Sequence, residues 1–135
     1  MHACRAWPAG LHWTAGLRRL AAILVLVLIF AMPALGQQEL ERAKIEFLID
    51  SIAQLHDAVF IRNATDYSSA QAAEHLRLKL RNAGARVRTA EDFITRCASA
   101  SSMSGEKYRI RFADGHVVDN AVFLRQKLAE FRGPP

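Results

Sequence analysis

Cysteine is scarce in this 135-residue chain, which contains only Cys4 and Cys97. Cys4 lies in an N-terminal segment that we expect to be removed, so Cys97 remains alone and no internal disulfide can form. The chain also lacks a His-x-x-x-His motif, a closely spaced cysteine pair and a paired array of carboxylates. The sequence therefore predicts no metal site and no cofactor.

Acidic residues are absent from the first 36 positions, where Arg5, Arg18 and Arg19 are the only charged side chains. An unbroken apolar run occupies residues 20–31, and Met32-Pro33 interrupts it. The small residues Ala34 and Gly36 then stand three and one positions before a possible cleavage point at Gln37. This layout is typical of a secretory signal peptide.

We therefore expect residues 1–36 to be a cleaved signal, residues 37–132 to form one domain, and residues 133–135 to be a tail. The protein would then be exported to the periplasm without a stable membrane span. An uncleaved signal anchor is the alternative, although the apolar run of 12 residues is shorter than the roughly 20 that a spanning helix needs.

A large excess of positive charge is also missing once the signal is set aside. The chain has 18 Lys and Arg and 13 Asp and Glu; three of the basic residues lie in the signal, which leaves 15 against 13 and a net charge of +2. So small a net charge gives no basis for a nucleic-acid partner.

Apolar residues at helical spacing predict four helices in the mature chain. The first covers residues 38–56. The second begins with the capping box Ser68/Gln71 and ends at Gly84, with Leu76 and Leu80 on its apolar face. A third begins with the capping box Thr89/Asp92, and a fourth follows Asp119 or Asn120. The face of the third helix that should point inward comprises Ala90, Phe93, Ile94, Cys97, Ala98 and Ser101. Residues 57–63 favour extended structure, and residues 63–68 are predicted to be a polar loop.

The clearest strand signal is the alternation of Tyr108, Ile110 and Phe112 with basic residues, followed by the turn pair Asp114-Gly115. It predicts a small hairpin near residues 107–118. Together these elements predict an α+β, mainly α fold of about four helices and one small β-hairpin in a single domain.

Catalytic groups are few. His75 lies beside the apolar face of the second helix, where it could act as a base or could tie a loop or Tyr108 to the helix. Ser102 and Ser104 lie in a serine-rich turn that lacks the Gly-x-Ser-x-Gly elbow of serine hydrolases, so a turn role is the simpler interpretation. His75, Ser102, Ser104 and Tyr108 are the candidates for catalysis.

Basic side chains provide the stronger indication of function. The window that contains Arg77, Lys79 and Arg81 has no acidic residue up to Arg88, and Arg109 and Arg111 share one face of the predicted strand. If helix and strand are neighbours, these five side chains could bind an anionic ligand. A solvated face balanced by nearby acids is the alternative.

Several short motifs occur in an order that resembles the YfeK-like family of small exported bacterial proteins. They are Phe60-Ile61-Arg62-Asn63, His75-Leu76-Arg77-x-Lys79-Leu80, Thr89-Ala-Glu-Asp-Phe-Ile94, Ala98-Ser99-x-Ser101-Ser102-x-Ser104-Gly105, and Tyr108. The resemblance covers residues 40–131. It implies a periplasmic, mostly helical bacterial protein and carries no activity, cofactor or catalytic residue with it.

We therefore expect a non-enzymatic periplasmic module that binds an anionic ligand or an envelope partner through the basic helix and strand. The alternative is a small envelope hydrolase or transferase with a His/Ser pair. The partner itself is not predicted.

Overall fold

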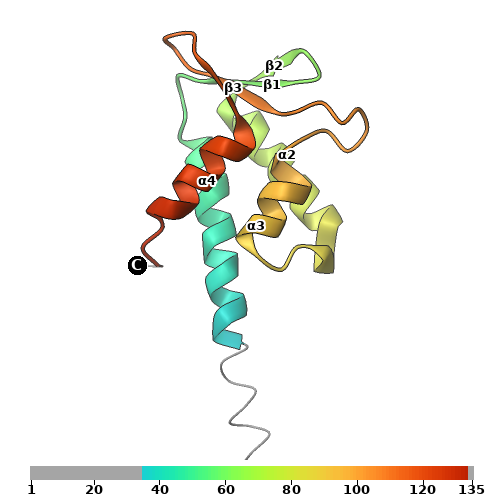
Figure 1. Ribbon diagram of the computed structural model, residues 1–135, viewed down its shortest axis with the longest axis vertical. Helices are drawn as coiled ribbons and strands as arrows, with labels where there is room; N and C mark the ends of the chain where they lie inside the picture. The colour runs from blue at the N-terminus through green and yellow to red at the C-terminus, as the bar shows by residue number, and fades with distance from the viewer. Residues whose placement is uncertain (1–34, 134–135) are drawn as a thin grey trace, which may run out of the picture. The chain divides into compact units, whose positions relative to one another are not determined.

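Helices make up most of the computed structural model, which describes residues 35–133 (Figure 1). The first helix covers residues 35–53, and the later ones are α2 (Ser69–Ala83), the 3₁₀ turn η1 (Gly84–Arg86), α3 (Ala90–Phe93), the π-helix η2 (Ile94–Ala98) and α4 (Asn120–Glu130). This content confirms the predicted mainly helical α+β fold. The predicted secretory signal, apart from its last two residues, lies outside the described residues.

Within residues 35–133, short strands form a four-stranded antiparallel sheet in the order β2-β1-β3-β4. The strands are β1 (Val59–Arg62), β2 (Thr65–Tyr67), β3 (Arg109–Arg111) and β4 (Val117–Asp119). The β3–β4 hairpin is the one predicted from the sequence, and β1 confirms the extended segment. The pairing of β1 with β3 joins this hairpin to a second one, β1–β2, which was not predicted.

The prediction of a polar loop over residues 63–68 is wrong, because β2 occupies the centre of that segment. Arg62 pairs with Thr65, so only Asn63 and Ala64 connect the two strands. Both residues have positive φ angles, 49° and 57°. Two such residues match the twist of a tight hairpin, and Asn is well suited to the first position.

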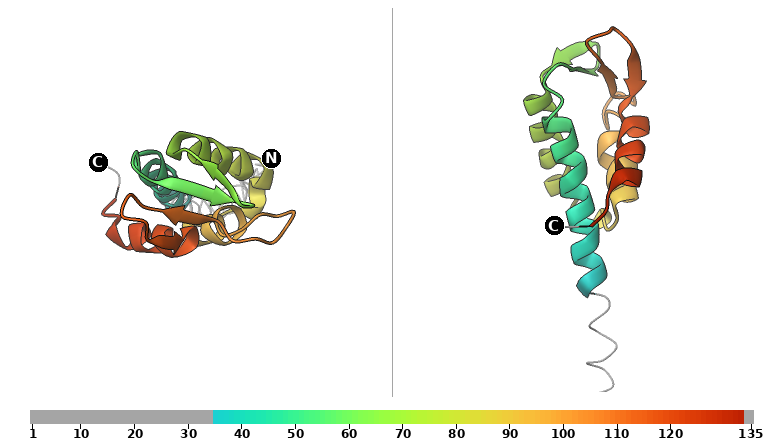
Figure 2. Two further views of the ribbon diagram at one scale, coloured as in Figure 1. Left: turned by 90° about the horizontal axis from the view of Figure 1, so that it is seen from above. Right: turned by 90° about the vertical axis from the view of Figure 1, so that its left-hand side faces the viewer.

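The helices lie in two rows, with the sheet across one end (Figure 2). The first helix and α2 form one side, and α3, η2 and α4 form the other. The strands extend over the ends of both rows. This arrangement brings the beginning of α2 and the beginning of α4 close to the same sheet.

Local signals set most helix ends as predicted. The Ser68/Gln71 capping box begins α2, and Gly84, with φ of 53°, follows its last residue. Thr89 and Asp92 form the second predicted capping box, at α3. Asp119 occupies the N-cap position of α4, but its carboxylate accepts a hydrogen bond from Lys107 rather than from the helix.

The first helix ends earlier than predicted, at residue 53 instead of 56. Its last turn tightens, since the amide of Leu55 bonds the carbonyl of Ile52, and the amide of Ala58 bonds that of Leu55. His56 and Asp57 lie exposed on the resulting turn. The turn places buried Ala58 directly before β1, so packing of the sheet overrides the helical tendency of these residues.

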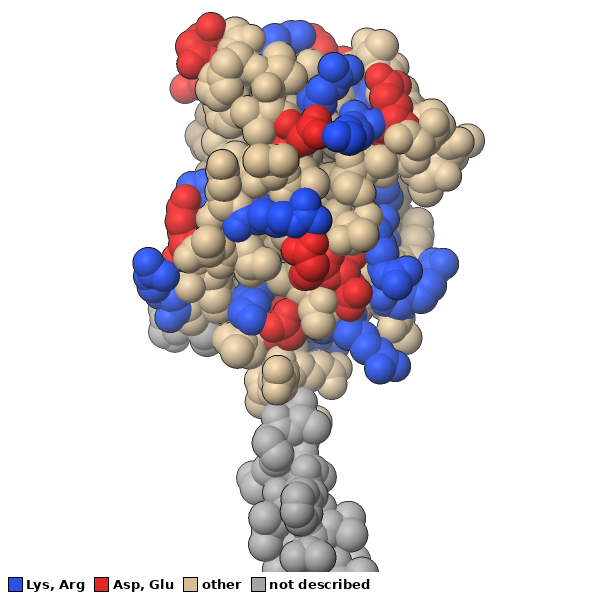
Figure 3. Space-filling view, viewed as in Figure 1, with Lys and Arg blue, Asp and Glu red and all other residues tan. Residues whose placement is uncertain are grey.

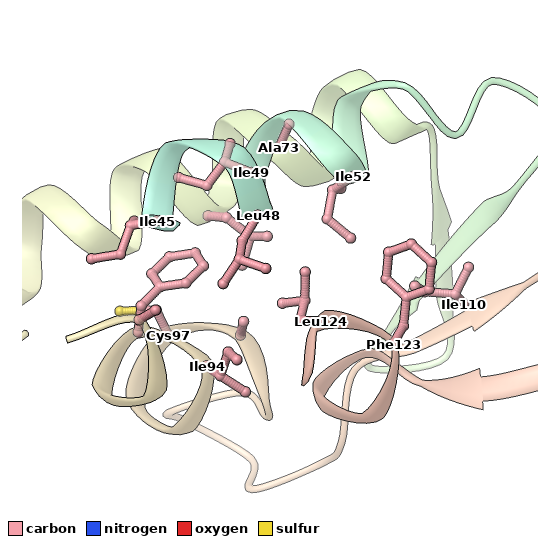
Figure 4. Close-up of a cluster of buried hydrophobic side chains, with 14 of the residues drawn as sticks. Ile45, Leu48, Ile49, Ile52, Ala73, Ile94, Cys97, Ile110, Phe123 and Leu124 are labelled. Carbon is pink, nitrogen blue, oxygen red and sulfur yellow. The ribbon is translucent and has the colours of Figure 1, made fainter. Parts of the chain in front are cut away.

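The core lies between the two rows of helices, where the first helix contributes side chains that have almost no exposure (Figure 4). Leu48, Ile49 and Ile52 are 0% exposed. The predicted apolar face of the third helix is fully buried and comprises Ala90, Phe93, Ile94, Cys97, Ala98 and Ser101. Leu76 is 3% exposed, as its place in the α2 stripe predicted.

Candidate functional site

A pocket of about 430 Å³ opens between α2 and the sheet. Its walls are largely apolar, and polar side chains reach it from four elements. The lining residues are Phe60, Ile61, Arg62, Tyr67, Ala70, Gln71, Ala72, Glu74, His75, Leu76, Tyr108, Arg109 and Asn120. Pockets of this size with a few convergent polar groups are the usual form of a small-molecule site.

Two of the residues predicted for catalysis meet in this pocket. The Nε2 atom of His75 lies 3.3 Å from the hydroxyl oxygen of Tyr108, and its Nδ1 atom lies 3.5 Å from a guanidinium nitrogen of Arg62. The ammonium of Lys79 donates to the same Tyr108 hydroxyl at 3.3 Å and to the carbonyl of Ala100 at 2.8 Å. His75 is thus linked through Tyr108 to Lys79.

This geometry assigns the proton of His75. A guanidinium group can only donate, so the Nδ1 atom that faces Arg62 accepts and the neutral ring carries its proton on Nε2. Nε2 then donates to the Tyr108 oxygen, which also accepts from Lys79. The hydroxyl hydrogen of Tyr108 is left to donate elsewhere.

Burial governs the titration of the cluster. It lowers the pKa of His75 below its usual value near 6.5, and the charges of Arg62 and Lys79 lower it further. Burial also lowers the pKa of Lys79 and raises the pKa of the Tyr108 phenol. His75 is therefore a neutral hydrogen-bonding group at neutral pH.

Two buried polar atoms among the described residues lack a hydrogen-bond partner, and both belong to residues that line this pocket. They are Nε of Arg62 and Oδ1 of Asn120. The orientation of the Asn120 amide is determined, because its Nδ2 donates to the carbonyl of Ala98 at 2.9 Å and an oxygen there could not. Unpaired buried polar atoms are rare and costly, so their coincidence here marks the pocket.

The structure does not bring the two candidate serines to His75. The hydroxyl of Ser104 donates to the side-chain oxygen of Asn63, and Ser102 lines a different pocket. Both belong to the turn that follows η2, in which the amide of Gly105 bonds the carbonyl of Ser101. The predicted turn role accounts for their contacts.

The predicted basic residues do not form one free patch, because carboxylates neutralise three of them. Arg77 bonds Asp50 and Glu74, at 3.1 and 2.9 Å. Arg111 pairs with Asp66, and Arg109 lies 3.7 Å from Glu106. These ion pairs favour the alternative of a face balanced by acids, and two of the acids, Asp50 and Asp66, are distant in sequence. Lys and Arg likewise alternate with Asp and Glu on the face over α4 (Figure 3).

The other two predicted ligand-binding residues lie apart from those ion pairs. Lys79 is half-buried and belongs to the Tyr108 cluster, as described above. Arg81 is exposed in the last turn of α2. Arg109 is the predicted basic residue that also lines the His75 pocket.

Arg62 and Asn120 were missed as site residues. Each lies at the edge of its element, Arg62 as the last residue of β1 and Asn120 as the first of α4. For Arg62 the sequence signal is a charged side chain at the end of an apolar strand. Asn120 offers no such signal, because what distinguishes it is that it is only 2% exposed. Burial of that kind depends on tertiary packing.

Within residues 35–133, no three His, Cys, Asp or Glu side chains are placed so that they could hold a metal ion. The same part of the chain contains no helix with the length and apolarity required to span a bilayer.

Comparison with known proteins places the chain in a family. The sequence model of a protein family described as "Family of unknown function (DUF5329)" matches residues 39–132, which include every residue that lines the His75 pocket. The chain belongs to this family. The "Uncharacterized protein YfeK" of Salmonella typhimurium is 39% identical over 85 residues, covering 62% of this chain and 71% of that protein, which confirms the YfeK-like resemblance. No solved structure matches the chain.

The lowered pKa of His75 predicts a loss of stability in mild acid. The folded protein disfavours the imidazolium, whereas the unfolded chain protonates His75 near pH 6.5, so stability falls as the pH drops through that value. We expect the thermal midpoint of the wild type to fall more than that of His75→Gln between about pH 7.5 and pH 5.5. Equal shifts in the two proteins would contradict a neutral, half-buried His75.

Proposed function

We propose that this protein is an exported, non-enzymatic binding module that takes a small amphipathic anion into the pocket between α2 and the sheet. The observation that carries the proposal is the convergence of Arg62, Tyr108 and Asn120 on a largely apolar pocket, with both unpaired buried atoms belonging to residues that line it. Export rests on the signal-like N-terminal segment.

The polar groups of the pocket indicate which charged group the ligand carries. Arg62 retains an unpaired N–H, and Tyr108 retains a hydroxyl hydrogen after accepting from His75 and Lys79. Both are donors, and they suit a carboxylate, sulfonate or phosphate oxygen. Oδ1 of Asn120 can accept one hydrogen from the ligand. Glu74 disfavours a ligand of high negative charge, so a single acidic group fits best.

The apolar walls define the rest of the ligand. Phe60, Tyr67, Ala72 and Leu76 line the pocket from both the sheet and α2. Burial of apolar ligand surface against them would contribute about 25 cal/mol per Å². The ligand class is therefore an anion with an aliphatic or aromatic body, and a bare inorganic ion would use only part of the site.

The hydrolase alternative has less support. A serine nucleophile needs a base within hydrogen-bond reach, and the hydroxyls of Ser102 and Ser104 have other surroundings. Tyr108 is close to His75, but burial raises the pKa of its phenol and so disfavours the nucleophilic phenolate. The His75–Tyr108 pair is better suited to hold a ligand than to attack one.

The test uses anilinonaphthalene sulfonate, a fluorescent anion with an aromatic body, and the variant Arg62→Gln. We expect the wild type to bind the dye and Arg62→Gln to bind it about tenfold more weakly, because a charge-assisted hydrogen bond to the sulfonate is lost. Arg81→Gln removes the same charge from an exposed position outside the pocket and should change the affinity less than about twofold. Fluorescence titration measures both.

Folding is checked separately by the thermal midpoint. Arg62→Gln removes an unpaired buried nitrogen together with the long 3.5 Å contact to Nδ1 of His75, so the midpoint should fall by only a few degrees. Absence of dye binding by the folded wild type, or equal binding by wild type and Arg62→Gln, would refute the proposed pocket.

A further inference from the structure

A second pocket, of about 390 Å³, lies at the far end of α2. Residues from α2, η1, η2 and the serine-rich turn line it, and no Asp or Glu is among them. They include Lys79, Asn82, Arg86, Arg96, Cys97 and Ser102. In the space-filling view, Lys and Arg gather along the flank formed by the end of α2 and η1, unlike the mixed charges over α4 (Figure 3).

Three cations from three different segments therefore share one concave surface. Arg86 is held in place, because its Nε and one terminal nitrogen donate to the carbonyls of Ala83 and Asn82 at the end of α2. Its other terminal nitrogen has no hydrogen-bond partner among residues 35–133, so it can donate to a ligand. Holding a guanidinium in this way reduces the conformational entropy that it loses when it binds a ligand.

Arg96 forms one loose ion pair among residues 35–133, with Asp92. Its Nε lies 3.8 Å from Asp92, beyond hydrogen-bond distance, and 57% of its side chain is exposed. The π-helix η2 carries it, and π-helical turns are rare and occur often at functional sites. The adjacent Cys97 is 1% exposed, and burial raises the pKa of its thiol, so no thiolate opposes an anion here.

We propose that this second pocket binds a phosphate-type dianion, with Arg86, Arg96 and Lys79 supplying the positive charge and Asn82 and Ser102 supplying hydrogen bonds. Guanidinium groups match phosphate oxygens in pairs, and three cations without a lining carboxylate favour a doubly charged ligand over a single carboxylate. The site is distinct from the amphipathic pocket at His75 and does not depend on the function proposed for that pocket.

The site would accept either a free phosphate or a phosphate monoester in a lipid head group, since both present doubly charged terminal phosphate oxygens. Inorganic phosphate and vesicles containing phosphatidic acid separate these sources. The variant Arg96→Gln removes a cation without removing a structural hydrogen bond. Arg42→Gln is the matched control, because Arg42 is also an exposed helical arginine with a loose acidic neighbour, Glu39 at 3.6 Å.

We expect calorimetry at low ionic strength to detect inorganic phosphate binding that weakens about tenfold in Arg96→Gln and less than about twofold in Arg42→Gln. Binding to vesicles alone, with the same dependence on Arg96, would support the site and assign its phosphate to a lipid. Equal affinity of Arg96→Gln and wild type, or binding of neither probe by the folded wild type, would overturn the proposal.

Discussion

Leu48→Ala is expected to lower the free energy of unfolding by about 2–5 kcal/mol. Leu48 is 0% exposed on the first helix and points into the core between the two rows of helices (Figure 4). Truncation removes apolar contacts and leaves a cavity that several packed helices can close only in part. Since total stabilities of 5–15 kcal/mol are usual, the loss would be a large share of the whole.

Leu78→Ala is the matched control for this prediction. It makes the same chemical change in a helix, but Leu78 is 45% exposed on α2. We expect it to alter the free energy of unfolding by less than about 0.5 kcal/mol. Urea titration of both variants, with unchanged m values, measures the difference. Similar losses in the two variants would mean that the first helix does not pack as described.

Asn120→Asp is expected to destabilise the protein by about 3–5 kcal/mol at neutral pH, although it changes a single atom. Asn120 is 2% exposed, and its Nδ2 donates to the carbonyl of Ala98 at 2.9 Å. A carboxylate oxygen at that position cannot donate and would repel the carbonyl oxygen. The charge would be buried without a partner, which is among the costliest substitutions in a folded protein.

The sign of the pH dependence makes this prediction specific. Burial raises the pKa of the new carboxyl in the folded state, so the variant loses stability as the pH rises above the unfolded pKa of about 3.9. Near that pH the protonated acid can still donate to Ala98, and the difference from wild type should shrink. Gln126→Glu makes the same amide-to-acid change at an exposed position of α4 and should lack this dependence.

The fold could be predicted as far as local signals reach. The capping boxes at Ser68 and Thr89 and the apolar stripes of the helices depend on neighbours within one or two turns, and the structure confirms them. The β1–β2 hairpin and its pairing with β3 depend on contacts such as Phe60 with Ile110, which are 50 positions apart. No local pattern specifies such a register.

The candidate site was likewise predictable only where residue type or local sequence was enough. His75 and Tyr108 could be singled out by residue type, and the structure brings them together. The pairing of Arg77 with Asp50 and of Arg111 with Asp66 joins residues from separate elements, so these arginines looked free in the sequence. Arg62 and Asn120 were missed because their importance arises from burial in the assembled fold.

Lys79 links the two pockets, since its ammonium donates to the Tyr108 hydroxyl of the first pocket and the residue also lines the second. A single ammonium cannot point fully toward ligands in both pockets at once. A ligand that attracts this ammonium into one pocket changes the hydrogen bonds that Lys79 can offer to a ligand in the other pocket. Thermodynamic linkage requires each ligand to change the binding free energy of the other by the same amount. Occupancy at either end of α2 would therefore be sensed at the opposite end through one lysine.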